Sequence, residues 1–483
     1  MAKLKGHAVI ELTDAQTGKK ERVEHDNIIT KGAEDLLNAY AARFGYSVAN
    51  SALMTMKQKL FCGIYVFSNT LTENVNNKIL PDIAETVLTG YASNITSDGN
   101  DNRRGDYNAE ESGDVSNGFK FVWDFGTNDA NGDIAAIGLT NYIAGEHGYK
   151  YAPLAAFSKT QSATGSTKSN YRGTGAEMSG IAIKSGNLGE FYYLADFTGD
   201  IITFIQKTST TNIRIRKYKI CLYDSELDLS NTLYNMALVS EDNITIADST
   251  QTETGVLFVD GGDGFYYGLY GYNSGNNYIL KVSKLNKSTN VYTAAQSYTL
   301  TNINMPSIRV RTGYSEVYLA AAEINNGYIY AYYGANQGDS STGTCGIVKI
   351  TLNNPEEYVK LTETERSYSW AAFTQFYYMF KQNGNIFTIG DVIGSDGSTI
   401  IALGDFTPNF ASGYGGYGIT KSNGKYLLLT LFSNNTSNIG GSNQTLALLP
   451  NLQQIESINN LDSPVTKTAA KTMKITYTLT YAE

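Results

Sequence analysis

The sequence predicts an all-β protein with two parts: a jelly-roll-like β-sandwich with one short helix, and an inserted β-propeller of about five blades. Three observations predict this architecture. A turn glycine followed by an aromatic-rich apolar run recurs five times in the later two-thirds of the chain. Short apolar stretches alternate with Asn-Gly and Asp-Gly pairs. The 483 residues include 36 Tyr and 47 Gly, yet only 17% are charged, against about 25% in typical globular domains.

The repeated unit is a strand hairpin. Its five copies begin at glycines 40 to 75 residues apart and read G-E-F-Y-Y-L-A (189–195), G-F-Y-Y-G-L-Y (264–270), G-Y-I-Y-A-Y-Y (327–333), G-N-I-F-T-I-G (384–390) and G-K-Y-L-L-L-T (424–430). A second apolar or alternating stretch follows some copies, at 278–285, 346–352 and 399–404. Units of this length resemble propeller blades of about 40–50 residues with added loops, and the long first step leaves room for a sixth blade. A β-helix, which needs a stricter period, is the second choice.

Turn chemistry separates the strands of each unit. Asn-Gly and Asp-Gly supply the positive φ angles that tight hairpins need, and they stand at Asp263-Gly264, Asn326-Gly327, Asn383-Gly384, Asp396-Gly397 and Asn423-Gly424. These turns predict antiparallel hairpins within each repeat.

The first 149 residues form a different domain. Alternating or apolar stretches predict strands at 7–13, 21–30, 60–67, 85–91, 118–125 and 134–140. Between the second and third of them, apolar residues at helical spacing predict a helix over Lys31–Phe44, with Thr30 as its N-cap. The polar residues 92–117 are expected to form a long exposed loop.

The last strand of the chain belongs with this first domain. Met473 to Tyr481 alternates apolar residues with Thr and Lys, a pattern closer to the N-terminal strands than to the aromatic hairpins. We therefore expect residues 464–483 to complete the domain of residues 1–149, with the propeller, 150–463, inserted between them. The alternative is that this strand closes the propeller ring.

Composition narrows the function. The net charge is −9 with no basic block, which speaks against a nucleic-acid partner, and no apolar run approaches the roughly 20 residues of a membrane helix. The N-terminus does not read as a signal peptide, so we expect folding in a cytoplasm. The odd set Cys62, Cys221 and Cys345 has no ligand-like spacing, and none of the three histidines, His7, His25 and His147, is near a cysteine.

Several motifs invite a functional interpretation that their context does not support. Gly413 to Gly418 matches G-x-G-x-x-G but precedes a strand instead of a helix, and Asp98 to Asn102 opens like a calcium loop but lacks its glycine and glutamate. A glycosidase would need paired carboxylates, for which the candidates are Asp196, Asp260, Asp263, Glu323, Asp391 and Asp405. These carboxylates share no local signature, so the sequence predicts no catalytic, metal-binding or cofactor-binding residue and no enzyme activity.

The N-terminal region carries a family resemblance. The run G-H-A-V-I-E-L-T-D-A-Q-T-G-K-K-E-R-V-E-H-D-N-I-I-T (6–30) with the helix after it resembles the opening of virion proteins from tailed bacteriophages. W-D-F-G-T-N-D-A-N-G-D-I-A-A-I-G-L-T (123–140) is similar to a pattern of tail-fibre or baseplate-attached proteins. Together these stretches cover roughly residues 1–140. The resemblance implies a domain that is fixed to the virion and a variable domain that faces outward.

The expected function follows from this division. The chain is expected to be a structural virion protein of a tail fibre or baseplate, or a receptor-binding component, which is assembled in the bacterial cytoplasm and located in the virion. Its expected partners are other virion proteins, further copies of itself, and a host-surface glycan or protein recognised by residues that the sequence does not identify. The alternatives are a carbohydrate-active propeller enzyme on a virion and a head decoration protein.

Overall fold

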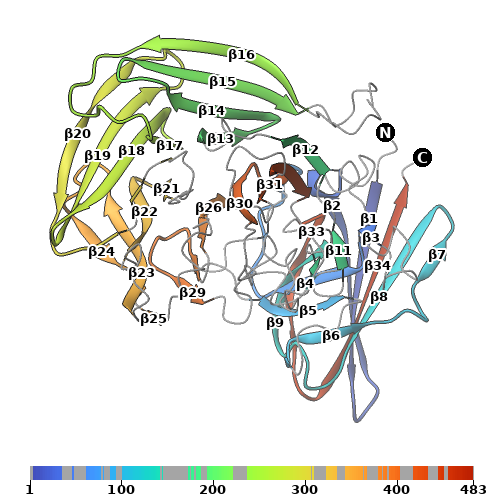
Figure 1. Cartoon of the computed structure of the whole chain (residues 1–483). Coiled ribbons are helices and arrows are strands. Elements are labelled where there is room, and N and C mark those ends of the chain that lie inside the picture. The colour runs from blue at the N-terminus through green and yellow to red at the C-terminus, as the bar shows by residue number, and fades with distance from the viewer. Residues whose placement is uncertain are drawn as a thin grey trace. The chain divides into compact units, whose positions relative to one another are not determined.

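The computed structural model shows an all-β protein that divides into two units (Figure 1). The first unit comprises residues 1–158, 168–179 and 450–483, and the second comprises 159–167 and 180–449. The structure describes residues 4–34, 46–47, 61–77, 80, 88–93, 101–141, 144, 172–173, 176–178, 181–186, 193–220, 236–305, 307–308, 310, 322–333, 343–362, 364–366, 379–382, 384–388, 391–402, 417–432, 444–450 and 455–481.

The first unit contains a closed nine-stranded barrel. Its circuit runs through strands β34 (Lys471–Tyr481), β1 (Leu4–Asp14), β2 (Lys20–Ile29), β33 (Ser457–Lys467), β9 (Gly132–Thr140), β4 (Gly63–Phe67), β5 (Leu88–Ser93), β6 (Arg104–Tyr107) and β8 (Gly118–Phe125), which returns to β34. The short strand β7 (Gly113–Val115) extends from β8 outside the circuit. The pairings around the circuit are antiparallel except that of β5 with β6.

The expected sandwich is therefore wrong in its topology. Strand β34 pairs with β1 from Lys471 to Tyr481 and with β8 from Met473 to Thr480. Since both sides of this strand are hydrogen-bonded, the sheet closes on itself and leaves no pair of separate sheets to face each other. The alternation in 473–481 does mark a strand of this unit, and its inward residues are fully buried.

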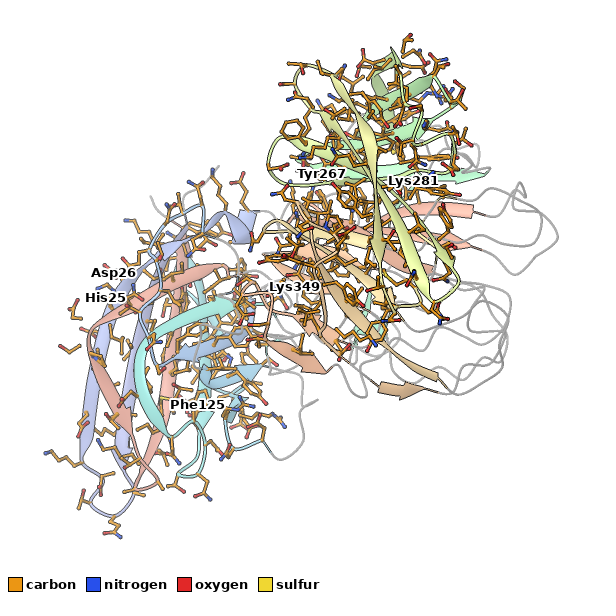
Figure 2. The ribbon with its side chains drawn as sticks, turned by 90° about the vertical axis from the view of Figure 1, so that its left-hand side faces the viewer. His25, Asp26, Phe125, Tyr267, Lys281 and Lys349 are labelled. Atoms are coloured by element: carbon orange, nitrogen blue, oxygen red, sulfur yellow. The ribbon has the colours of Figure 1, made fainter. Side chains whose placement is uncertain are left out.

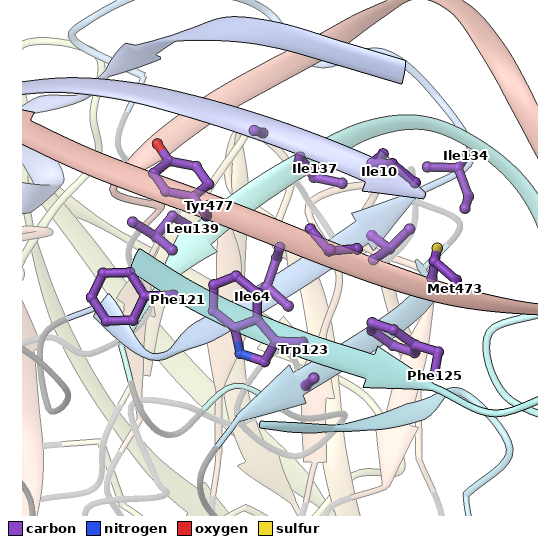
Figure 3. Packing of buried hydrophobic residues seen from close by; sticks show 14 of the residues in the cluster. Ile10, Ile64, Phe121, Trp123, Phe125, Ile134, Ile137, Leu139, Met473 and Tyr477 are labelled. Atoms are coloured by element: carbon purple, nitrogen blue, oxygen red, sulfur yellow. The ribbon is translucent and has the colours of Figure 1, made fainter. Parts of the chain in front are cut away.

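The interior of the barrel is packed with large apolar side chains (Figure 3). Trp123 and Phe121 stack at a centroid distance of 6.1 Å, and Phe119 lies 4.6 Å from Phe121. The indole nitrogen of Trp123 donates a hydrogen bond to the carbonyl oxygen of Cys62, 2.9 Å away. The only polar atom of the Trp123 side chain is therefore satisfied by the backbone.

Two further expectations for the first unit meet the structure in part. Of the expected helix Lys31–Phe44, residues 31–34 are helical and 35–44 lie outside the described residues; the side-chain oxygen of Thr30 accepts from the Gly32 amide at 3.1 Å, as a cap does. The stretch 92–117 is not one loop, because β6 and β7 lie within it. A small sheet joins β10 (Arg172–Gly173), β11 (Ala176–Met178) and β3 (Tyr46–Ser47).

The second unit is a propeller-like arrangement of meandering antiparallel sheets. Its sheets are β13 (Leu194–Thr198), β14 (Ile201–Lys207), β15 (Asn212–Ile220) and β16 (Met236–Thr245); β17 (Leu257–Asp260), β18 (Phe265–Ser274), β19 (Asn277–Asn286) and β20 (Tyr292–Leu300); β21 (Ala322–Asn325), β22 (Tyr328–Tyr333), β23 (Gly343–Thr351) and β24 (Tyr358–Lys360), with β25 (Thr364–Arg366) also on β23; β26 (Phe380–Gln382), β27 (Asn385–Phe387), β28 (Asp391–Ile393) and β29 (Ile400–Ala402); and β12 (Ile181–Gly186), β32 (Gln444–Pro450), β31 (Tyr426–Phe432) and β30 (Tyr417–Ser422).

The turns within these sheets have the predicted chemistry. Gly264, Gly327, Gly384 and Gly424 have φ angles of +80° to +90° and lie between the first and second strands of their sheets. Asn326, before Gly327, also has a positive φ of 49°, as a two-residue hairpin turn of type I′ requires. Among the described residues, no helix is long and apolar enough to span a bilayer.

We expect β34 to tolerate substitution on one face only. Ile475 is fully buried between Ile10 and Trp123 on the neighbouring strands, whereas Thr476 points to the opposite face. Ile475→Ala should lower the free energy of unfolding by about 2–5 kcal/mol because it leaves a cavity in the barrel. Thr476→Ala, the matched control, should change it by no more than about 0.5 kcal/mol. Equilibrium urea unfolding measures both, and equal effects would contradict the assignment of the two faces.

Candidate functional site

Charged side chains gather on the strands that line the middle of the second unit. We call β13, β17, β21, β26 and β30 the inner strands, because each contacts the next and β30 contacts β13. Every inner strand carries a charged residue, and together these make the inner-strand cluster: Asp196, Asp260, Glu323, Lys381 and Lys421. The cluster thus holds three carboxylates and two ammonium groups.

The most buried pair of the cluster joins strands that are not neighbours. Lys421 of β30 forms a salt bridge with Glu323 of β21, and β26 contacts both of these strands. The Glu323 side chain is only 3% exposed and that of Lys421 15%. Because a buried charge is costly unless it is paired, each of these two residues depends on the other.

Asp260 is held by backbone and by lysine. Burial alone would raise its pKa, but a salt bridge of 2.6 Å from Lys287 and a hydrogen bond of 2.6 Å from the Gly262 amide outweigh burial and lower the pKa below its usual value. Lys381 adds positive charge nearby and donates to the carbonyl oxygen of Ile324 at 3.0 Å. Asp260 is therefore ionised at neutral pH, which suits an ion pair better than a general acid.

Asp196 is linked to Asp260 through a buried tyrosine. Its carboxylate accepts a hydrogen bond from Thr198 at 3.0 Å and one from the Tyr266 hydroxyl at 3.4 Å. Burial, and then the charge of Asp196, raise the pKa of Tyr266. The ammonium group of Lys287 lies 4.6 Å above the ring of Tyr266. A chain of polar contacts therefore runs from β13 to β17.

The structure separates the candidate carboxylates into groups. Asp196, Asp260 and Glu323 lie together on consecutive inner strands. Asp263 lies in the turn after β17, where it accepts from the Tyr267 hydroxyl at 2.6 Å and the Phe265 amide at 3.2 Å. Asp391 is the first residue of β28, which is the third strand of its sheet and not an inner strand. Asp405 lies outside the described residues.

The two lysines of the cluster are site residues that the sequence analysis did not identify. A usable signal existed, since K-Q-N-G at 381–384 and K-S-N-G at 421–424 place a lysine three residues before the turn glycine in two successive repeats. The charged position and the turn belong to the same repeat. Searching the repeats for polar positions at a fixed distance from the glycine would have found both lysines.

Several described tyrosines of the repeats are core residues that also contact lysines. Figure 2 labels one of them, Tyr267, and the lysines Lys281 and Lys349. Tyr267 and Tyr270 on β18 are buried and stand directly opposite Lys284 and Lys281 on β19. The ammonium groups of these lysines lie 5.4 Å and 5.9 Å from the respective ring centroids, within the range of cation–π attraction. In another sheet, Lys349 lies 4.1 Å from the ring centroid of Tyr328.

The remaining motifs have structural explanations where they are described. Cys62 is a buried cysteine, and Asp101 forms a salt bridge of 2.7 Å with Arg103. His7 lies 2.9 Å from Asp26, and His25 lies 3.5 Å from Asp462. The described ranges contain no group of three or more His, Cys, Asp or Glu residues that could hold a metal ion. Residues 98–100, 147, 221 and 413–416 lie outside these ranges.

Comparison with known proteins gives weak structural likeness only. No protein-family model matches the chain, and no curated protein matches it. The β-propeller domain of the Trilobed protease from Pyrococcus furiosus is similar at 11% identity and a TM-score of 0.24, over 57% of this chain and 71% of that one. TolB from Acinetobacter baumannii is similar at 10% identity and a TM-score of 0.21, over 76% and 82% of the two chains. The α-L-arabinofuranosidase Arb93A from Fusarium graminearum is similar at 9% identity and a TM-score of 0.20, over 81% and 98%.

We expect the Glu323–Lys421 pair to be important for the stability of the second unit. Lys421→Met removes one partner and leaves a buried carboxylate uncompensated, so the free energy of unfolding should fall by about 3–5 kcal/mol. Adding Glu323→Leu to Lys421→Met should restore part of the loss. Glu241→Gln, which breaks the exposed pair between Arg216 and Glu241 on β15 and β16, is the control and should have little effect. Urea unfolding measures these changes, and equal losses for Lys421→Met and Glu241→Gln would contradict a buried pair.

Proposed function

We propose that the chain is a structural protein of a tailed-bacteriophage virion, in which the first unit anchors the protein and the second unit is displayed for host-surface recognition. The observation that carries this proposal is the division of the chain. Both ends of the sequence pair with each other in one closed barrel, and most of the residues between β9 and β33 belong to the second unit. A barrel built from both chain ends supports an inserted domain without needing it for its own closure.

The virion assignment rests on the resemblance of residues 6–30 and 123–140. These stretches supply β1, β2, the end of β8 and β9, which all belong to the barrel circuit. The resemblance and the proposed anchor therefore fall on the same folded unit. Other virion proteins are the expected partners of this unit.

For the displayed unit, we propose a five-bladed propeller. The support is that β13, β17, β21, β26 and β30 contact one another in a closed series. Each of them is also the innermost strand of an antiparallel sheet of at least four strands. Strand β12, the first strand of the unit in the described ranges, pairs as the outermost strand of the sheet that holds β30, so the two ends of the repeat region share one blade. Such shared blades close many propeller rings.

A carbohydrate-active enzyme is the second candidate. The specific observation in its favour is that Asp196, Asp260 and Glu323 lie on consecutive inner strands, where glycosidases of propeller fold could place their carboxylates. The lowered pKa of Asp260 and the salt bridge of Glu323 with Lys421 favour a structural role for these two residues. A head decoration protein is the third candidate and differs from the first in its position in the particle.

We expect binding without cleavage. Full-length protein should bind cells or surface polysaccharide of the host and release no shortened oligosaccharide on prolonged incubation, because the inner-strand carboxylates are already engaged in structural contacts. Pull-down onto host cells and chromatography of the polysaccharide measure the two properties. Release of shortened oligosaccharide would establish the enzyme instead, provided that two conditions hold. Asp260→Asn or Glu323→Gln must abolish the release, and the turn variant Asp263→Asn must retain it. Density for the protein on the head of the intact particle would establish decoration.

We also expect several copies to be arranged with rotational symmetry. Virion attachment sites repeat by rotation, and many weak contacts to a host surface become effective through multivalency. Reconstruction of the particle by electron cryomicroscopy should show neighbouring copies that contact each other through the first unit. A single isolated copy in each particle would contradict this expectation.

A further inference from the structure

A group of polar side chains lies inside the barrel of the first unit, at positions where alternating strands normally place apolar residues. We call it the barrel polar site, and its members are Asn27 of β2, Glu456 immediately before β33, Ser457 and Asn459 of β33, and Tyr477 of β34. Their neighbours identify the face on which they lie. Ser457 and Asn459 are paired with Leu139 and Ile137 of β9, and both of these side chains belong to the barrel core.

The side chains of this site converge above a glycine. A Cβ atom placed on Gly6 of β1 would lie 2.2 Å from Oδ1 of Asn27 and 2.3 Å from the hydroxyl oxygen of Tyr477. Glycine at this position therefore makes room for the two polar groups, which approach it from opposite neighbouring strands. The aromatic ring of Tyr477 packs among apolar side chains of the barrel (Figure 3).

The oxygen atoms of the site have no hydrogen-bond partner among the described residues. This holds for both carboxyl oxygens of Glu456 and for Oδ1 of Asn27 and of Asn459. The hydroxyl groups of Ser457 and Tyr477 interact with each other but do not meet hydrogen-bond geometry. Glu456, Ser457 and Tyr477 are each completely buried. The amide nitrogen of Asn459 does donate, to the carbonyl oxygen of His25 at 2.9 Å, which leaves its oxygen to face the site. Unsatisfied buried oxygens in such number are unusual in a folded protein.

The negative charge of Glu456 makes its burial especially costly. The Glu456 carboxyl is completely buried, and neither of its oxygens has a partner among the described side chains. The Ser457 hydroxyl and the Glu456 carboxyl both lie close to the Tyr477 hydroxyl. His25, which is paired with Ala8 of β1, directs its Nε2 atom toward Asp462, and its Nδ1 atom is buried without a hydrogen-bond partner. A buried carboxylate without a partner is too costly to persist, so it must bind either a proton or a cation.

We propose that the barrel polar site binds a monovalent hard cation, Na⁺ or K⁺, with Glu456 as its one charged ligand and Asn27, Ser457, Asn459 and Tyr477 as neutral oxygen ligands. Every candidate ligand atom is oxygen, which hard cations prefer over softer transition metals. One carboxylate balances one positive charge. Dedicated Ca²⁺ sites use about 6–8 oxygens and commonly include several carboxylates, of which this site has one.

The bound cation would stabilise the barrel by linkage, because only the folded state assembles the ligands. A tenfold rise in the concentration of a saturating ligand corresponds to about 1.4 kcal/mol at 25 °C, or a rise in melting temperature of about 3–5 °C for a unit of this size. The single Trp123 in the barrel core reports this transition once Trp370, the other tryptophan of the chain, is replaced by Phe. The Trp370→Phe protein is the reference for the variants below.

The experiment is a thermal melt of this full-length reference protein by tryptophan fluorescence. The salts are NaCl or KCl at 10 and 100 mM, with choline chloride keeping the ionic strength constant, and the concentrations are about tenfold apart as the linkage estimate requires. We expect the melting temperature to rise with Na⁺ or K⁺ and not with choline. Glu456→Gln should abolish the rise, and Tyr477→Phe should reduce it. Glu24→Gln, an exposed carboxylate on β2, is the matched control and should retain the full rise.

Three results would overturn the proposal. The first is the same melting temperature in Na⁺, K⁺ and choline, which would make Glu456 a protonated carboxyl. The second is an unchanged cation response in Glu456→Gln or, if that variant does not fold, in Tyr477→Phe. The third is a rise in melting temperature with CaCl₂ but with neither NaCl nor KCl. If K⁺ raises the melting temperature, crystals soaked in RbCl give an independent measurement, because Rb⁺ replaces K⁺: an anomalous peak beside the Glu456 carboxyl is expected, and its absence would contradict a K⁺ site there.

Discussion

Closure of the first barrel by the last strand is the constraint on which the rest of the structure depends. Strand β34 is hydrogen-bonded to β1 on one side and to β8 on the other, and its inward side chains Met473, Ile475 and Tyr477 fill the interior. Without this strand, β1 and β8 would each present an open edge and an exposed apolar face. The first unit is therefore complete only when both ends of the chain are in place, and the second unit is confined to the sequence between them.

Local patterns predicted the strands of the barrel well and its closure poorly. Alternation at 7–13, 118–125 and 473–481 marks one buried face on each strand, and each of these strands is present. Alternation says nothing about whether the last edge of a sheet meets its first edge. That outcome depends on pairing between residues 4–14 and 471–481, a long-range contact without a local signature. The short strands β6 and β7 were not predicted, and neither was β33, whose residues 457–463 had been assigned to the propeller, because polar residues dominate all three.

In the repeats, the turn chemistry was more reliable than the aromatic runs. Four of the runs form the second strand of a sheet, but F-Y-Y-L-A at 191–195 leads into β13, an inner strand, whose turn glycine is Gly199 with a φ of +58°. Inner and second strands are both buried on two faces, so both read as continuous apolar stretches. The positive-φ glycine distinguishes them. The lysines of K-Q-N-G and K-S-N-G stand three residues before such a glycine, which places them on inner strands. The positions of the charged cluster can therefore be found in the sequence.

The two units treat buried charge in opposite ways, and the contrast bears on how each functions. In the second unit, Glu323 and Asp260 are matched by Lys421 and Lys287, so the charges stabilise the arrangement of the inner strands. In the barrel, Glu456 has no such partner among the described residues. A barrel needed only as a scaffold would be more stable with apolar residues at these inward positions. Departures from a locally consistent pattern concentrate at sites that serve another purpose, so the polar interior of the barrel is better explained by an occupant than by folding alone.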